Sequence, residues 1–307
     1  MHEIPIFGDI IHFFWGVPIF FTLSGFLIWQ SIGRSKTFGE YCRKRFWRIY
    51  PELWVAVLIE LVVILLLNHQ PLNWPQFGLF AVGQGTIFQF WTPDCLRGYG
   101  CGCPNGALWT ICVLIQFYFF AYFLYKLLHN KGIVRWIITI IIFALISYFT
   151  PFLKMFMPET VGKLYDMTLF SHLWMFLVAA CFAEYKDKVL PFVIKYWWIF
   201  ILANLLFKYG LKFDLPMGEN RYGLICTLTL LFGLVGFAYR FPVFDVKRDI
   251  SYGVYIYHMT VINAAIALGF SGTPLCFIVV LLITCSFAWL SAKYIGEFSK
   301  KMKYKTR

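Results

Sequence analysis

Long apolar runs, separated by short polar connections, follow one another along the whole chain. We count about nine runs of roughly 15–23 residues, and about 20 apolar residues are enough for a helix to cross a bilayer. The predicted spans are residues 11–32, 52–67, 107–127, 133–151, 169–183, 190–207, 222–239, 250–269 and 274–295. This pattern predicts an all-α fold, a polytopic integral membrane helical bundle with about nine transmembrane helices.

One further apolar run, residues 76–91, is interrupted by Gly78, Gly83 and Gly85. It is either re-entrant, interfacial or a full crossing. If it does not cross, the Lys and Arg residues of the connections fall overwhelmingly on one side, together with those of the C-terminal tail. Because cytoplasmic loops are rich in Lys and Arg, this distribution predicts an external N-terminus and a cytoplasmic C-terminus. It also argues against a full crossing of residues 76–91.

Composition supports a lipid environment. Of 307 residues, 60% are hydrophobic and 21% aromatic, whereas soluble domains are about 45–50% apolar by a similar count. A net charge of +12 could suggest nucleic acid, but basic cytoplasmic loops explain it, so we expect the lipid bilayer and no nucleic acid as a partner. No repeat, linker or low-complexity tract divides the chain, which predicts a single domain over residues 1–307. The oligomeric state is left open.

Three cysteines, Cys95, Cys101 and Cys103, cluster in the polar stretch 92–106. A zinc site would need four ligands, and no histidine lies near them, so we expect no metal. A disulfide is possible in an oxidising exterior and would leave one thiol over. Three unpaired thiols fit the sequence equally well.

The stretch "YCRKRFWRIYP", residues 41–51, is unusually cationic for a chain of which only 14% is charged. Its four cations are Arg43, Lys44, Arg45 and Arg48, here called the basic segment. One interpretation is ordinary cytoplasmic anchoring. The other is an anion site, because Arg45 and Arg48 would share a helix face and guanidinium groups suit phosphates. Coenzyme A and anionic lipid headgroups are both candidate ligands.

Five segments, in order, resemble the membrane-bound acyltransferase family 3. They are "GVPIFFTLSGFLI" (16–28), "FGEYCRKRFWRIYP" (38–51), "NGALWTICVLIQFYFFAYFLY" (105–125), "DISYGVYIYHMTVI" (249–262) and "AKYIGEFSKK" (292–301). Each alone is a weak signal, but their order over most of the chain is specific. The resemblance implies a family fold of about ten helices with both termini cytoplasmic. We therefore expect an acyltransferase 3-type transmembrane domain that is N-terminally truncated by its first helix.

The resemblance also implies a function. Members move acyl groups, most often acetyl from acetyl-CoA, onto hydroxyls of cell-surface or lipid-linked glycans at the cell membrane. By this resemblance Arg43, Arg45 and Arg48 would bind the donor, and Gln116 and Tyr118 the acceptor. Leu114 replaces a glutamate that many members carry, which weakens any role for a carboxylate there. Ser24 and Gly25 more simply permit close helix packing.

Two histidines are the predicted catalytic residues. The family's essential histidine precedes the "GV" pair by roughly a dozen residues, and this spacing favours His2 over His12. An arginine about ten residues before that histidine would lie upstream of this sequence. His258, in "YIYHM", lies within a predicted span, where it either lines a pore or is satisfied by Tyr255 or Tyr257. A neutral imidazole can take the proton of an acceptor hydroxyl or carry the acyl group itself.

Two other functions compete with an O-acyltransferase. A transporter or exporter would be expected to show an inverted repeat or paired broken helices, and we detect neither. A catalytically impaired fragment is the second alternative, given the expected truncation. We also expect Glu297, at the end of the last span, to pair with the basic segment.

Overall fold

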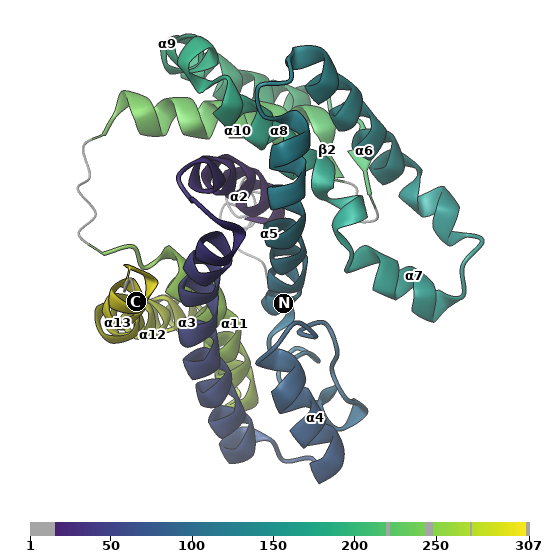
Figure 1. The fold of residues 1–307 in the computed structure, drawn as a ribbon. Coiled ribbons are helices and arrows are strands. Elements are labelled where there is room, and N and C mark those ends of the chain that lie inside the picture. Colours follow the sequence, from purple (N-terminus) through teal and green to yellow (C-terminus); the bar gives the residue numbers. More distant parts are fainter. Residues whose placement is uncertain (1–15, 219–221, 243–247, 271, 305–307) are drawn as a thin grey trace. The chain divides into compact units, whose positions relative to one another are not determined.

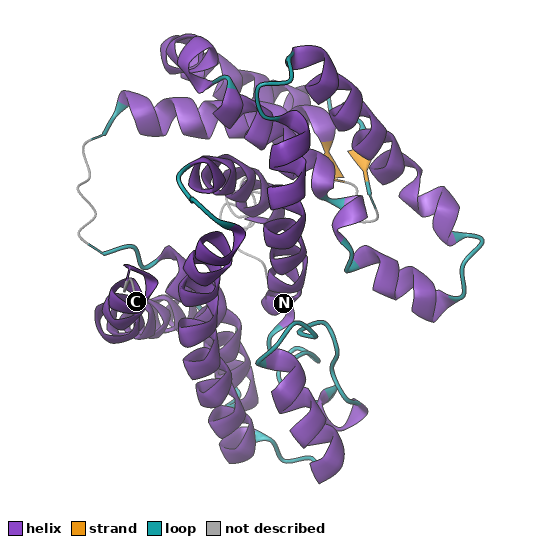
Figure 2. Ribbon diagram, viewed as in Figure 1, coloured by secondary structure: helices purple, strands orange, loops and turns teal. Residues whose placement is uncertain are grey.

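A computed structural model describes residues 16–218, 222–242, 248–270 and 272–304 of the chain. Within these ranges the protein is almost entirely helical (Figures 1 and 2). The strands there are β1 (Pro216–Met217) and β2 (Tyr222–Gly223), an antiparallel pair in which Pro216 lies opposite Gly223. The predicted all-α, polytopic fold is confirmed.

Each predicted span contains a helix. These helices are α2 (Gly16–Gly33), α3 (Phe38–Leu67), α5 (Trp109–Leu128), α6 (Ile133–Lys154), α8 (Leu173–Glu184), α9 (Lys186–Leu205), α10 (Leu224–Arg240), α11 (Ser251–Ala267) and α12 (Pro274–Ser291). Among the described residues, six helical segments are long and apolar enough to cross a membrane, namely those containing α2, α3, α5, α6, α9 and α12. Helices α8 and α10 are apolar but shorter. The chain is therefore a multi-pass membrane protein.

The ambiguous run at 76–91 holds only a short helix, α4 (Trp74–Gln84). Its N-terminus is capped by Asn73, whose side chain accepts a hydrogen bond from the Gln76 amide at 3.2 Å. With 11 residues α4 is about 16 Å long, roughly half the hydrocarbon thickness of a bilayer. This length agrees with the expectation that the run does not cross fully.

Helix α3 begins at Phe38, well before the apolar span predicted at 52–67. Pro51 lies inside the helix, where it removes one backbone hydrogen bond. Membrane helices tolerate such a proline, and an ion pair of 2.6 Å between Lys44 and Glu40 supports the first turns. As a consequence the basic segment is helical and continuous with the apolar part of α3.

The chain forms two compact units, which we describe separately. Unit 1 consists of the described parts of Gly39–Cys112 and Val246–Arg307. It contains most of α3, then α4, α11, α12, the short π-helical segment η5 (Ala292–Gly296) and α13 (Glu297–Tyr304). In this unit α11 approaches α12 closely at Gly253, where an added Cβ would lie 2.7 Å from the Ala288 Cα. A hydrophobic cluster of Ile64, Phe77, Phe80, Leu96 and Tyr99 joins α3 to α4 and the 92–106 connection.

That connection also contains two short 3-10 turns, η1 (Asp94–Leu96) and η2 (Gly106–Leu108).

Unit 2 consists of the described parts of Pro5–Phe38 and Val113–Asp245. Besides α2, most of α5, α6, α8, α9 and α10, it holds α7 (Glu159–Asp166) and the short turns η3 (Leu169–Ser171) and η4 (Leu206–Gly210). Helix α2 packs against α8 at Gly25, where a Cβ would lie 2.3 Å from the Phe176 carbonyl oxygen. The expectation that Gly25 permits close helix packing is confirmed.

Candidate functional site

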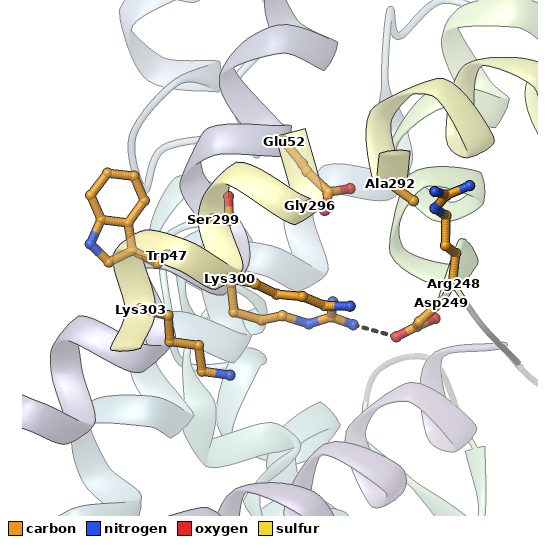
Figure 3. A pocket seen from close by; sticks show the side chains of 10 residues that line it. Trp47, Glu52, Arg248, Asp249, Ala292, Gly296, Ser299, Lys300 and Lys303 are labelled. Atoms are coloured by element: carbon orange, nitrogen blue, oxygen red, sulfur yellow. Dashed lines mark hydrogen bonds and ion pairs between the residues drawn. The ribbon is translucent and has the colours of Figure 1, made fainter. Parts of the chain in front are cut away.

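A pocket of about 170 Å³ lies in unit 1, between α3, the residues just before α11, and the η5–α13 segment (Figure 3). Its lining residues are Trp47, Arg48, Glu52, Arg248, Asp249, Ala292, Gly296, Ser299, Lys300 and Lys303. Four of them are cations and two are carboxylates. We call it the cationic pocket. Its excess of positive charge makes it a candidate site for a small, highly charged anion.

Arg48 is held in the cationic pocket by two neighbours. Its Nη2 lies 2.7 Å from Asp249 Oδ2, the contact drawn in Figure 3. Its guanidinium carbon lies 5.9 Å from the centre of the Tyr252 ring, and the Tyr252 hydroxyl donates to the Ile49 carbonyl at 3.1 Å. These contacts fix the orientation of the guanidinium group while Arg48 remains partly exposed.

The second arginine of the pocket, Arg248, contacts Glu297. Its Nη2 and Nε lie 3.0 and 3.3 Å from Glu297 Oε1, and its guanidinium carbon lies 5.7 Å from the centre of the Trp289 ring. The expectation that Glu297 pairs with the basic segment is therefore wrong: among the described residues its ion-pair partner is Arg248, in the connection before α11. Arg248, Lys300 and Lys303 were expected only as basic residues of a connection and of the C-terminal tail. The signal available was their position beside two of the family-like segments.

The other predicted donor-binding arginines do not line the pocket. Arg45 stacks on its own helix, with its guanidinium carbon 5.6 Å from the centre of the Tyr41 ring. Arg43 and Arg45 are both partly buried on α3. The structure thus brings Arg48, and not Arg43 or Arg45, to the cationic pocket. The involvement of all three in donor binding stays a prediction.

The charge of Asp249 is stabilised in this site. Burial alone would raise the pKa of Asp249, but hydrogen bonds from Ser251 and the nearby Arg48 cation outweigh burial, so the pKa lies below its ordinary value. The Ser251 amide and hydroxyl lie 3.1 and 2.5 Å from Asp249 Oδ1. Asp249 therefore remains ionised and compensates part of the positive charge of Arg48.

We expect acid to weaken this interaction. Because the folded-state pKa of Asp249 is depressed, its stabilising contribution is complete above the ordinary carboxyl pKa of about 4 and is lost as the pH falls through the folded-state value. Between about pH 5 and pH 3 the melting temperature of the purified protein should fall more steeply than that of Asp249→Asn. The exposed Asp94→Asn serves as the matched control. Parallel curves for wild type and Asp249→Asn would contradict the interpretation.

His258, the catalytic residue predicted within the described chain, lies on α11 in unit 1. Its Nδ1 lies 2.7 Å from the Tyr255 carbonyl oxygen. When Nδ1 donates this hydrogen bond, the neutral ring presents Nε2 as the proton acceptor. The Tyr255 phenol in turn contacts the Thr110 hydroxyl and the Ala107 carbonyl at the start of α5. His258 is thus hydrogen-bonded to Tyr255, as one interpretation expected, and its catalytic role stays a prediction.

The distance between His258 and the cationic pocket can be estimated from the helical rise per residue of α11. Nine residues separate Asp249 from His258, which corresponds to about 14 Å along α11. The predicted catalytic His2 lies outside the described residues, as does the alternative His12.

The predicted acceptor-binding residues lie on α5 in unit 2. The Gln116 side chain donates to the Met167 carbonyl at 2.7 Å and accepts from the Leu169 amide at 3.0 Å. Both ends of its amide therefore hold the connection between α7 and η3. Tyr118 is partly buried on the same helix. A contact of either residue with an acceptor stays a prediction.

The cysteines of the 92–106 connection are free thiols in the structure. Cys103 lies 3.3 Å from the Thr92 hydroxyl, and the Cys101 thiol donates to the Cys103 carbonyl at 3.7 Å. Within the part of the chain that the structure describes, no group of three or more His, Cys, Asp or Glu residues is arranged to hold a metal ion.

These features define a multi-pass helical membrane protein with a pocket lined by four cations and a histidine on α11 that is hydrogen-bonded to its own helix. The chain belongs to acyltransferase family 3, whose family model, described as an acyltransferase domain, matches residues 2–293. The protein is therefore a membrane acyltransferase.

Two relatives have similar sequences along most of their length. One is nodulation protein 10 of Rhizobium leguminosarum bv. viciae, 25% identical over 94% of this chain and 82% of that protein. The other is an O-acetyl transferase of Shigella phage Sf6, 25% identical over 93% of this chain and 86% of that protein. No solved structure matches the chain.

Proposed function

We propose that the protein is an integral-membrane O-acyltransferase that moves an acyl group, in the first place acetyl, from acyl-CoA to a hydroxyl of a cell-surface or lipid-linked glycan. The observation that carries the proposal is the cationic pocket, in which four cations from three separate segments converge. The name of the phage relative, an O-acetyl transferase, supports acetyl as the group transferred. In this proposal the protein lies in the cell membrane, with the pocket and the C-terminus on the cytoplasmic side.

Coenzyme A matches the charge of the pocket. Its diphosphate and its ribose phosphate are rich in negative charge, and Arg48 and Arg248 offer planar forks that bind phosphate oxygens in pairs. Lys300 and Lys303 add point charges from α13. A pocket of about 170 Å³ takes one phosphate-bearing part of the cofactor. The extended pantetheine arm would then carry the thioester along α11 toward His258.

The proposed transfer needs one base. The acceptor hydroxyl oxygen attacks the thioester carbonyl carbon, its proton passes to His258 Nε2, and the carbon–sulfur bond breaks. The proton then passes from the imidazolium to the thiolate of coenzyme A. The hydrogen bond from Nδ1 to Tyr255 keeps the ring in the tautomer that this step requires.

Exchanging Arg48 for lysine tests the donor site. Arg48→Lys keeps the positive charge that fixes topology but loses the planar guanidinium group. A charged hydrogen bond contributes about 1.5–3 kcal/mol, and about 1.4 kcal/mol corresponds to a factor of ten. The KM for acetyl-CoA should therefore rise by about tenfold. The assay is acetyl transfer from acetyl-CoA to de-O-acetylated surface polysaccharide of the host, in membranes with equal protein abundance.

Two further variants sharpen this test. The double variant of Arg45 and Arg48 should behave like Arg48→Lys alone, because Arg45 stacks on Tyr41 outside the pocket. The exposed Arg135→Lys is the matched control. An unchanged KM for acetyl-CoA in Arg48→Lys would reduce the basic segment to a topology signal. No acetyl transfer by the wild type would instead favour the exporter alternative.

A further inference from the structure

An acidic residue, Glu60, lies in the middle of the apolar part of α3 and is only 1% exposed. Twelve residues separate it from Arg48, which places it about 18 Å from the cationic pocket along the helix. Carboxylates in membrane-spanning segments are rare because leaving water is costly for a charge, and those that occur are usually functional. Glu60 plays no part in the donor site described above.

Polar side chains lie beside Glu60, and several of their hydrogen-bonding atoms have no partner among the described residues. The Asn105 amide lies beside its carboxyl, although no hydrogen bond of normal geometry joins them. Burial and the nearby Glu60 carboxyl together raise the pKa of the Tyr99 phenol to about 12. Among the described residues, neither Glu60 oxygen, nor Asn105 Oδ1, nor the Tyr99 hydroxyl has a hydrogen-bond partner. Three buried side chains thus gather hydrogen-bonding atoms that the fold itself does not satisfy.

These side chains are not loosely placed. Asn105 Nδ2 donates to the Ile256 carbonyl at 2.9 Å, which ties the 92–106 connection to α11. Asn263 holds the same connection at three points: its Oδ1 accepts from the Cys101 amide at 2.8 Å, and its Nδ2 lies 2.9 and 2.6 Å from the Cys103 and Pro104 carbonyls. The unpaired atoms are therefore held by satisfied neighbours. A site that is rigid before its ligand arrives is the arrangement expected for specific binding.

The chemistry of the three groups selects their ligand. A carboxyl and an amide oxygen accept hydrogen bonds, and a phenol both donates and accepts. A divalent cation would need more carboxylate ligands than this site offers, and a phosphate has only acceptor oxygens, which cannot bind the amide oxygen of Asn105. A hydroxyl group fits, since it donates to a carboxylate and accepts from a phenol. Carbohydrates offer several such hydroxyls.

We propose that Glu60, Asn105 and Tyr99 form a hydroxyl-binding site for the carbohydrate acceptor, which we call the acceptor site. This inference rests on the proposed function and deepens it, because it places donor and acceptor recognition at different positions along α3. Glu60 and Asn105 position the acceptor, and the chemical step remains with His258.

Kinetics with both substrates test the proposal. Glu60→Gln keeps the shape of the side chain but replaces a carboxyl oxygen by an amide NH2 group, so the KM for de-O-acetylated surface polysaccharide should rise by about tenfold to a hundredfold. The KM for acetyl-CoA should change by less than about twofold. Glu159→Gln, at an exposed glutamate of α7, is the matched control. A change confined to the KM for acetyl-CoA, or unchanged constants for both substrates, would overturn the acceptor site.

Two further measurements cover other outcomes. Dicyclohexylcarbodiimide, an apolar reagent for buried carboxyl groups, should label Glu60 in wild-type membranes, and the polysaccharide should slow this labelling as followed by mass spectrometry. Labelling that the polysaccharide does not slow would contradict the proposal even where activity is lost.

A second variant is used if Glu60→Gln lowers the abundance of the protein. Tyr99→Phe removes only a hydroxyl and should still raise the acceptor KM several-fold. An unchanged acceptor KM in this variant would count against the site. Failure of the proposed function has a separate signature, since the wild type would then transfer no acetyl group at all.

Discussion

His258→Gln is expected to slow acyl transfer by about 10²–10⁴-fold at saturating donor and acceptor, the range that a positioned general base contributes. Glutamine retains a polar group of similar reach but cannot take up the hydroxyl proton. The KM for acetyl-CoA should change little, because the cationic pocket lies about 14 Å away along α11. The measurement is kcat and both KM values in membranes with equal protein abundance.

The exposed His69→Gln is the matched control for this experiment. A variant of His258 that keeps more than half of the wild-type rate would show that the histidine only supports the Tyr255 turn. A loss of rate together with a loss of abundance would point to the same structural role, so folding is followed in parallel by the melting temperature.

Gly25→Ala is expected to disrupt unit 2. The new Cβ would lie 2.3 Å from the Phe176 carbonyl oxygen and 3.0 Å from its carbonyl carbon. Because these are backbone atoms within α8, no side-chain rotation can relieve the overlap, and α2 and α8 must move apart. Overpacking of this kind costs about 1–3 kcal/mol and occasionally more. The melting temperature in detergent should therefore fall clearly, with lower abundance in the membrane.

Gly78→Ala provides the comparison, since nothing lies within 4 Å of the Cβ it would add to α4. There alanine should be neutral or stabilising by up to about 1 kcal/mol, because glycine is the poorer helix former. Equal melting temperatures for the two variants would contradict the close approach of α2 and α8.

The helices were predictable because each apolar run is a local signal that needs no knowledge of neighbours. The start of α3 was not predictable in this way, because a proline such as Pro51 usually marks a helix boundary in a sequence. In the structure the helix begins at Phe38 and continues past Pro51. The start of α8 was also placed too early, because the apolar run at 169–183 includes the 3-10 turn η3 and the helix itself begins at Leu173.

The candidate sites were predicted only in part. Arg48 was found because its cationic neighbours closely precede it in sequence, but Arg248 and Lys300 meet it only through the fold. Local periodicity carries no information on such contacts. Glu60 was overlooked, although one acidic residue inside an apolar run is itself a signal. For Gln116 the structure adds a contact that the motif did not predict, since its side chain holds the backbone of Met167 and Leu169; its role in acceptor binding stays a prediction.

The ion pair between Arg48 and Asp249 has a consequence for metabolite selectivity. An anion that enters the cationic pocket competes with a carboxylate already bonded to the guanidinium at 2.7 Å. A simple organic acid offers Arg48 only the same type of group and gains nothing by the exchange, whereas a phosphate carries more charge and more acceptor oxygens. We therefore expect the built-in carboxylate of Asp249 to act as an internal competitor, so that monocarboxylates bind the cationic pocket more weakly than phosphates do.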